Sequence, residues 1–368
     1  MKKNKYIYGE ENHMKKIIFL ISILLVFLLQ FTTVELQAQE PYRVGTTAGS
    51  FLELGFGGAG LGMGDSYVSM ATDVSSIYWN PAGLGYMEKN ELMVMHQPWF
   101  ADISTSFVGL GFVYENIGTF GFGLSFVKYG EEEVTSMLMQ EGTGEKFDGL
   151  DLAFSLSYGK KLADWFSFGA TGKYISSRIW HESASAVVFD LGAIVNTSFL
   201  SWTGRNEDGL KIGMSISNYG TRMQYDGMDL KRPIDEKPDE AGNFAYVPAR
   251  YETQGWELPL IFRIGVSSYL FYSTNHKWVL SVDALHPNNN SEHLNIGTEY
   301  LFTLPGVGKL ALRAGYKGLM MVDSQYGWSF GAGFLVNYLD NNSIKIDYAY
   351  RDIGLLGKVH AYTFSLTF

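Results

Sequence analysis

Residues 358–368 read KVHAYTFSLTF, and large and small side chains alternate along the whole stretch. One face of this extended segment carries Tyr362, Phe364, Leu366 and Phe368, and the other carries Ala361, Thr363, Ser365 and Thr367. An alternation with a period of two residues predicts a β-strand whose two faces meet different surroundings. The segment therefore has one apolar face and one face of small or hydroxyl-bearing side chains.

The same alternation runs through the two preceding segments, 327–338 and 343–353. In the second of these, isoleucine and tyrosine side chains lie opposite Lys345, Asp347 and Arg351. A soluble β-sandwich would show the reverse, with large residues packed inward and many charges outward. Apolar residues outside and small or charged residues inside are typical of a barrel wall in lipid, because lipid offers no partner to charges or backbone groups.

Fourteen such segments can be counted along the chain, an even number as in bacterial outer-membrane barrels. Most are long enough for the tilted crossing of about 9–11 residues that a membrane strand makes. The segments are 91–97, 103–115, 118–129, 149–160, 165–179, 185–196, 209–219, 258–272, 277–286, 292–303, 309–318, 327–338, 343–352 and 358–368. The sequence thus predicts an all-β fold, a transmembrane antiparallel β-barrel of about 14 strands over residues 91–368.

The connections between these segments alternate in length, as in outer-membrane barrels with short periplasmic turns and long extracellular loops. The even-numbered connections include 115–118, 161–164, 273–276 and 339–342, with a longer one at 197–208. The longest odd-numbered connections are 130–148 and 220–257. We therefore expect both termini in the periplasm and these two long loops outside the cell.

Tryptophans support this topology, because aromatic girdles of outer-membrane barrels lie where strands meet the lipid interface. Six tryptophans fall at or near predicted strand ends: Trp99, Trp165, Trp180, Trp256, Trp278 and Trp328. Phe368, at the end of the last strand, resembles the terminal aromatic residue of such barrels.

The N-terminus has the pattern of a secretory signal peptide. Two lysines precede an apolar run from Ile17 to Leu29, and a small residue, Ala38, follows. The run is shorter than the ~20 apolar residues that a membrane-spanning helix needs. We expect residues 1–38 to be the signal peptide, with Met14 as the real start of the chain.

Composition narrows the function classes. The chain has no cysteine, which excludes a disulfide scaffold, a thiolate metal site and thiol catalysis. Its 38 acidic residues exceed its 28 basic ones, and its pI is near 5.2, whereas nucleic-acid binding needs a basic face. Only 18% of residues are charged, and there are 42 glycines. We expect no nucleic-acid partner, and outer-membrane lipid around the barrel.

Residues 39–90 are glycine-rich and alternate poorly. They contain AGLGMGDSYVSMATD at 59–73 and SSIYWNPAGL at 75–84, which together resemble the N-terminal signature of the PorV/PorQ family. That family is similar to the FadL-like group of outer-membrane barrels. The resemblance implies that residues 39–90 fold into the lumen of a 14-stranded barrel as a hatch. The hatch motif comprises Gly60, Gly62, Gly64, Asn80, Pro81, Ala82 and Gly83.

The resemblance implies a role in the type IX secretion system of Bacteroidetes-like bacteria, beside the translocon, where exported cargo is recognised by its C-terminal domain. The alternative is a FadL-like transporter of long-chain fatty acids or other hydrophobic small molecules, and a purely structural barrel is a third interpretation. In the secretion and transporter interpretations, the outer loops bind a partner or ligand through apolar residues. The simpler interpretation is that these residues only pack the loops onto the barrel rim. These residues are Met137, Leu138, Met139, Phe244, Tyr246 and Tyr251.

Eleven charged residues project inward if the alternation is continued through the strands. They are Asp151, Lys173, Asp190, Lys211, Arg263, Asp283, Glu299, Arg313, Lys345, Asp347 and Arg351. An ion-selective pore more often shows one sign of charge. The mixed signs favour a mutually neutralising network that holds the hatch.

No candidate active site emerges. The histidines lack metal-ligand spacing, and the acidic runs 131–133 and 235–240 lack EF-hand spacing. The glycines at 60, 62 and 64 lack the dinucleotide-binding spacing, and no Gly-x-Ser-x-Gly motif occurs. We predict a protein without catalytic residues, cofactor or metal.

Overall fold

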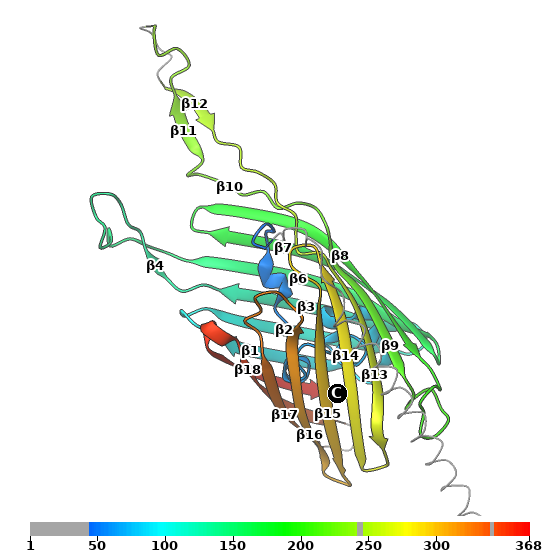
Figure 1. The fold of residues 1–368 in the computed structure, drawn as a ribbon. Helices are drawn as coiled ribbons and strands as arrows, with labels where there is room; N and C mark the ends of the chain where they lie inside the picture. Colours follow the sequence, from blue (N-terminus) through cyan, green and yellow to red (C-terminus); the bar gives the residue numbers. More distant parts are fainter. Residues whose placement is uncertain (1–43, 241–245, 339–341) are drawn as a thin grey trace, which may run out of the picture.

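The computed structural model describes residues 44–240, 246–338 and 342–368, and over these residues fourteen long antiparallel strands form one closed barrel (Figure 1). Each strand pairs with its neighbours along the chain, and β1 pairs with β19 to close the ring. The strands are β1 (Glu91–Pro98), β2 (Ser104–Tyr114), β3 (Gly118–Lys128), β6 (Gly149–Ala163), β7 (Phe166–Ile179), β8 (Glu182–Asn196), β9 (Lys211–Gly220), β13 (Ile261–Tyr272), β14 (His276–Pro287), β15 (His293–Leu304), β16 (Gly308–Leu319), β17 (Trp328–Tyr338), β18 (Asn342–Asp352) and β19 (Lys358–Thr367). The predicted all-β barrel is confirmed.

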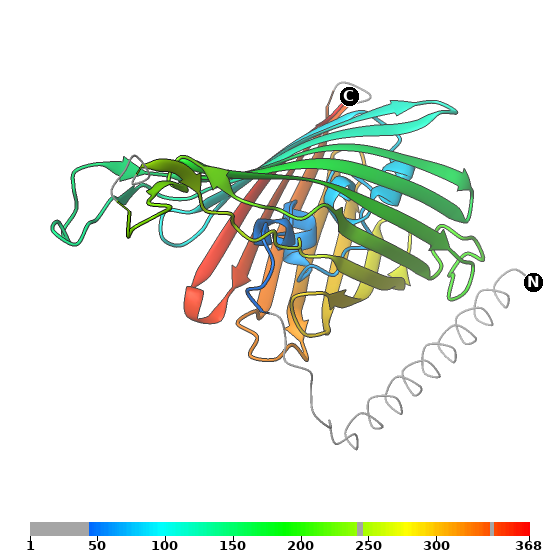
Figure 2. The ribbon, with the colours of Figure 1, turned by 90° about the horizontal axis from the view of Figure 1, so that it is seen from above.

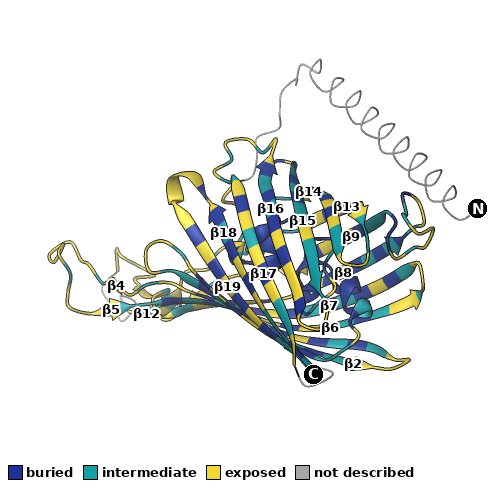
Figure 3. Ribbon diagram, turned by 90° about the horizontal axis from the view of Figure 1, so that it is seen from below, coloured by how far each residue is buried: buried dark blue, intermediate teal, exposed yellow. Residues whose placement is uncertain are grey.

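Burial alternates along the strands as the sequence predicts (Figure 3). On β17, Trp328 and Phe330 are 59% and 50% exposed on the outer wall, whereas Ser329 between them is 1% exposed. The outer wall is thus apolar, as lipid requires, and the inner wall is small or polar except where apolar residues pack against the N-terminal segment. Each predicted segment overlaps one strand, and the ends differ by no more than three residues.

One strand starts later than predicted. We expected a strand from residue 258, but β13 begins at Ile261. The amide side chain of Asn288 takes the place of the ladder here, donating to the carbonyl of Leu258 at 3.1 Å and accepting from the N–H of Leu260 at 3.0 Å. Trp256 therefore lies in the long connection, in an isolated bridge with Met223, and is no strand-end residue.

The two long connections carry short hairpins that we did not predict. In one, β4 (Glu132–Glu133) pairs with β5 (Lys146–Phe147); in the other, β11 (Lys231–Ile234) pairs with β12 (Val247–Arg250). A two-residue strand, β10 (Asp226–Gly227), joins the second connection to β8. Both hairpins project beyond the barrel at the end opposite the short connections (Figure 1). We call residues 129–148 the first arm and residues 221–257 the second arm.

The long connection after β8 is an ordered turn around Asp208. Its carboxylate accepts hydrogen bonds from the N–H groups of Trp202 and Thr203, both at 2.8 Å, and from the Ser201 hydroxyl at 2.7 Å. The Trp202 indole donates to the carbonyl of Tyr269 on β13 at 2.9 Å. These bonds fix the turn against the barrel end.

The first described residues, 44–90, form no part of the barrel wall, and we call them the N-terminal segment. They contain η1 (Ser50–Glu53), α2 (Gly58–Gly62), α3 (Ser76–Trp79) and η2 (Pro81–Tyr86), which lie within the ring of strands (Figure 2). Most of their apolar side chains are buried, in a core shared with inward residues of β1 and β2. No helix in the described part of the chain has the length and hydropathy to cross a membrane. Residues 1–43, with the expected signal peptide, Met14 and Ala38, lie outside the described residues.

Candidate functional site

The Asn-Pro-Ala motif forms a buried turn against the barrel wall. Asn80 caps η2, because its side-chain oxygen accepts a hydrogen bond from the N–H of Ala82 at 3.2 Å. Its amide nitrogen donates to the carbonyl of Val68 at 2.9 Å and to that of Ala193 on β8 at 3.1 Å. Pro81 occupies the first turn of η2, where a helix needs no N–H donor. The motif therefore ties the N-terminal segment both to itself and to the wall.

A row of wall glycines makes room for this turn. Gly159, Gly169 and Gly192 lie opposite one another on β6, β7 and β8. A Cβ at Gly159 would lie 2.6 Å from the carbonyl oxygen of Pro81, and side chains at the other two would overlap Pro81 and Asn80. The sequence alone does not mark these glycines as partners of the motif, since only strand register aligns them.

The glycine motif at 60–64 packs against the opposite side of the barrel. A Cβ at Gly62 would lie 2.9 Å from the Cα of Gly331 on β17. Gly64 has φ +65°, and its Cβ would lie 2.6 Å from the backbone nitrogen of Tyr316 on β16. Gly60 is covered by the Trp79 ring, whose Nε1 would lie 2.8 Å from a Cβ there. Gly62 and Gly64 thus allow backbone to approach backbone, and Gly60 leaves room for the Trp79 ring.

Gly64→Ala should lower the free energy of unfolding by about 2–4 kcal/mol, since the change combines an unfavourable φ with a backbone clash. Gly144→Ala is the matched control. Gly144 also has positive φ, +83°, but no atom lies within 4 Å of a Cβ there, so about 1 kcal/mol is expected. Urea unfolding of the refolded barrel measures both. Equal losses in the two variants would contradict the close packing of Gly64.

Buried ion pairs also join the N-terminal segment to the wall. Asp65 Oδ2 lies 2.7 Å from Lys317 Nζ on β16 and 3.1 Å from the Arg351 guanidinium on β18. Burial alone would raise the pKa of Asp65, but the attraction of Arg351 and Lys317 outweighs it, so the pKa is lowered. The stabilisation is therefore present at neutral pH and is lost as the pH falls through that lowered pKa. Asp65 and Lys317 were not among our predicted lumen residues.

A longer chain of charges crosses the lumen from Asp73. Lys345 Nζ lies 2.8 Å from Asp73 and 3.2 Å from Asp347, and Arg313 lies 2.7 Å from Asp347 and 2.6 Å from Glu299. Acid and base alternate along this chain. Each cation contacts two carboxylates, so two cations face three carboxylates and the charges largely offset one another, with no run of one charge sign along this chain.

The other predicted inward residues are also turned to the lumen or partly buried there. Lys173 pairs with Asp190 at 2.5 Å, and Asp283 accepts from the N–H groups of Tyr67 and Val68 at 2.7 and 2.9 Å. Asp151 accepts a hydrogen bond from the Tyr129 hydroxyl, and Lys211 is partly buried at the start of β9. Arg263 is buried as well. Asp283 thus holds the backbone of the N-terminal segment without an ion pair.

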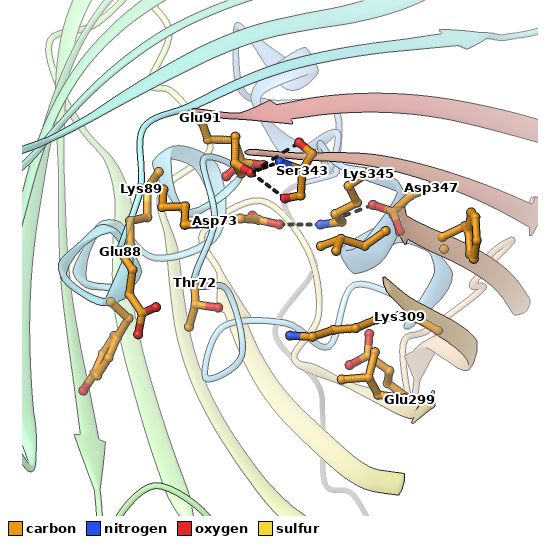
Figure 4. Close-up of a pocket in the computed structure, with 18 of the residues that line it drawn as sticks. Thr72, Asp73, Glu88, Lys89, Glu91, Glu299, Lys309, Ser343, Lys345 and Asp347 are labelled. Carbon is orange, nitrogen blue, oxygen red and sulfur yellow. Dashed lines mark hydrogen bonds and ion pairs between the residues drawn. The ribbon is translucent and has the colours of Figure 1, made fainter. Parts of the chain in front are cut away.

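A polar cavity of about 400 Å³ lies between the N-terminal segment and strands β15–β18 (Figure 4). It is at the end of the barrel where β1 begins and β19 ends, since Glu91 and Thr367 line it. The Asp73–Lys345 pair forms one side, and Lys309 and Glu299 lie on another. A cavity lined by so many charges suits water and ions better than an apolar molecule.

The predicted loop residues lie far from this interior. Both arms carry exposed apolar side chains, namely Met137 at 96%, Leu138 at 96%, Met139 at 55%, Tyr246 at 80% and Tyr251 at 62%. They do not pack onto the barrel rim. Phe244 lies outside the described residues. In the described ranges, no three His, Cys, Asp or Glu side chains are grouped to hold a metal ion.

A family model described as "Type IX secretion system protein PorV" matches residues 37–253, more than half of the 368 residues. The match begins before the N-terminal segment and extends through β12. The chain belongs to the PorV family. This confirms the family resemblance carried by the two N-terminal motifs and links this PorV-family barrel to type IX secretion. A search of curated protein sequences found none that matches it.

Solved structures similar to this PorV-family barrel include transporters and channels. The Pseudomonas putida toluene transporter TodX is 11% identical, with 85% of this chain and 96% of that chain covered and a TM-score of 0.52. The CymD monoaromatic hydrocarbon channel is 10% identical, with coverages of 85% and 96% and a TM-score of 0.51. A Pseudomonas aeruginosa FadL homologue is 13% identical, with coverages of 89% and 99% and a TM-score of 0.49.

At such identities TodX and CymD show the fold alone. Fold and family together make the chain an outer-membrane β-barrel in a non-enzymatic family.

Proposed function

We propose that this barrel is a non-enzymatic component of type IX protein secretion that handles cargo or a partner subunit at the cell surface. The match of residues 37–253 to the PorV family carries the proposal. The expected partners are secretion-system subunits and the C-terminal domains of exported cargo, and the arms are the expected contact surface.

The chemistry of the first arm supports a protein partner. Residues 129–148 contain six acidic residues and one lysine, a net charge of −5, and an exposed Met-Leu-Met tip. An arm of this charge is repelled by anionic lipid headgroups, so its tip is poorly suited to dipping into the membrane surface. Flexible methionine side chains are suited to apolar protein contacts.

The second arm also favours side-chain contacts. Pro233 and Pro248 lie opposite each other in β11 and β12, and the N–H of Tyr251 bonds to the carbonyl of Leu230 at 2.9 Å. This register turns the backbone of both prolines toward the outer edges of the hairpin, where proline has no N–H to offer. Strand addition at these edges is therefore disfavoured.

The topology we propose has residues 1–38 as signal peptide, residues 39–90 as a lumen hatch and residues 91–368 as the barrel. Both termini and the polar cavity then face the periplasm, and both arms face outside. The bonds of Asp65, Asp73 and Asn80 to the wall support a hatch that is fixed in place.

Transport of fatty acids or other hydrophobic molecules remains the alternative, and it has less support. The FadL-like fold is compatible with it, but the family match favours secretion. The N-terminal segment and ion pairs lie inside the barrel, and the polar cavity of about 400 Å³ there is lined by many charged residues. This cavity is therefore poorly suited to an apolar solute.

Secretion is tested by quantitative proteomics of culture supernatant, cell surface and periplasm in a strain that lacks the gene. We expect proteins with type IX C-terminal domains to be retained in the periplasm, and the wild-type gene to restore their release. An unchanged secretome in the deletion strain would contradict the proposal.

The arm is tested in the same strain with the triple variant Met137→Ser, Leu138→Ser, Met139→Ser. Cargo release should fall several-fold while the variant still reaches the outer-membrane fraction, because the exposed tip contributes nothing to the barrel core. Leu355→Ser is the control, since Leu355 is 90% exposed at the same barrel end but outside both arms. Equal release by the two variants would exclude the tip as the contact.

A further inference from the structure

Arg263 on β13 is buried inside the barrel without a carboxylate partner. It is 3% exposed, its guanidinium donates to the Ser217 hydroxyl at 2.8 Å, and it lies 5.5 Å from the centre of the Tyr78 ring. Among the described residues, no carboxylate oxygen lies within 4.0 Å of it. A guanidinium has five N–H donors, and an uncompensated buried charge is strongly destabilising. The remaining donors of Arg263 therefore call for an acceptor.

A hollow of about 70 Å³ lies beside this guanidinium, near the barrel end that carries the arms. Its polar lining includes Glu53, Asp65, His293 and Lys317. The volume corresponds to about two water molecules, which is room for a small ion and a water but not for a fatty acid. One oxygen of Asp65 is buried without a hydrogen-bond donor, so a water molecule accounts for part of the space.

Neighbouring groups leave Arg263 as the unmatched charge. Asp65 is already bonded to Lys317 and Arg351, and Asp283 to two backbone N–H groups. Burial raises the pKa of Glu53 more than a hydrogen bond from Asn289 and the attraction of Lys317 and Arg263 lower it. Once Glu53 is protonated, the surroundings of the hollow carry one positive charge too many.

We infer that this hollow binds one small monovalent anion, such as chloride, at the Arg263 guanidinium beside Lys317. The site is independent of the proposed secretion role. The Tyr78 and Tyr326 rings flank the two cations, with Lys317 Nζ 4.1 Å from the centre of the Tyr326 ring. The anion supplies the acceptor that no side chain provides, and its hydration shell is replaced by N–H donors.

Binding should tighten as the pH falls. Glu53 on η1, whose pKa is raised by burial, gains a proton, which leaves more net positive charge around the hollow. The other charged or titratable groups around it are Arg263 on β13, Asp283 on β14, His293 on β15 and Lys317 on β16. Asp65 stays ionised because the attraction of Arg351 and Lys317 lowers its pKa. Protonation of Glu53 and binding of the anion are therefore coupled.

Bromide locates the site directly. Crystals of the full-length protein grown in sodium bromide at pH 5.5 should show an anomalous peak in the hollow at Arg263. Crystals of the Arg263→Met variant should lack this peak.

In detergent, replacing sodium gluconate by sodium chloride at equal ionic strength should raise the thermal unfolding midpoint by about 2–4 °C at pH 5.5 and less at pH 8. Gluconate is too large for the hollow.

Two further variants separate the titrating groups. Glu53→Gln should retain the full chloride effect at pH 8, and His293→Gln should leave the pH dependence largely in place. Arg178→Met, an exposed arginine paired with Asp148 at 3.0 Å, should keep both the bromide peak and the chloride effect. Two results together would overturn the inference: wild-type crystals show no bromide peak, and the unfolding midpoints of wild type and Glu53→Gln at pH 5.5 are equal in the two salts. The hollow would then hold water only.

Discussion

Replacing Arg313 by methionine is expected to reduce the free energy of unfolding by about 3–5 kcal/mol. Arg313 is 8% exposed, and its guanidinium bonds Glu299 at 2.6 Å and Asp347 at 2.7 Å. Methionine keeps much of the side-chain volume but leaves two carboxylates with less compensation. Lys345 keeps contact with Asp347 at 3.2 Å, whereas Glu299 has no second cation within 4.0 Å among the described residues.

Urea unfolding of the barrel refolded into lipid vesicles, followed by tryptophan fluorescence, measures this loss. The control is Arg178→Met, whose pair with Asp148 is about half exposed on both sides and is worth about 1 kcal/mol or less. The double variant Arg313→Met, Glu299→Gln should recover part of the lost unfolding free energy, because it also removes the carboxylate that is left without a cation. A loss below about 1 kcal/mol for Arg313→Met would mean that water in the adjacent cavity solvates both carboxylates.

The barrel could be predicted from the sequence because its wall repeats a local pattern. Each strand shows its two faces within about ten residues, so no long-range contact is needed to recognise it. The late start of β13 at Ile261 escaped prediction for the opposite reason. There the side-chain amide of Asn288, 28 residues after Leu260, replaces the hydrogen bonds of the strand ladder. The alternation of nearby residues does not indicate this contact.

Prediction of the interior was less complete, since strand register decides which inward residues meet. The charges of the 343–353 segment were placed correctly, but their partners Asp65 and Asp73 come from the N-terminal segment, about 280 residues earlier in the chain. The glycines that receive Pro81 align only across three strands. The hairpin β11–β12 was also missed, because KRPI and VPAR show no alternation and each contains a proline.

Locking the N-terminal segment to the wall should separate the two candidate functions. Ser66 and Ser281 on β14 are fully buried, and their hydroxyl oxygens lie 3.0 Å apart. The chain has no cysteine, so Ser66→Cys, Ser281→Cys introduces a single pair of thiols already directed at each other. Oxidation joins the two thiols in a disulfide that closes a loop of more than 200 residues. For such a loop the chain-entropy model gives about 5 kcal/mol of stabilisation. Urea unfolding with and without reductant measures it.

If the segment is a fixed part of a secretion component, the oxidised variant should release type IX cargo at the wild-type rate. A transporter that opens by moving this segment should instead lose fatty-acid uptake on oxidation and regain it with reductant. The single variant Ser66→Cys controls for the loss of the hydroxyl bond, and Ser69→Cys, Ser267→Cys repeats the lock at a second pair whose oxygens are also 3.0 Å apart. Cargo release that stops in both locked variants but not in the single one would show that secretion itself needs the segment to move, against the fixed hatch that its ion pairs and glycine contacts favour.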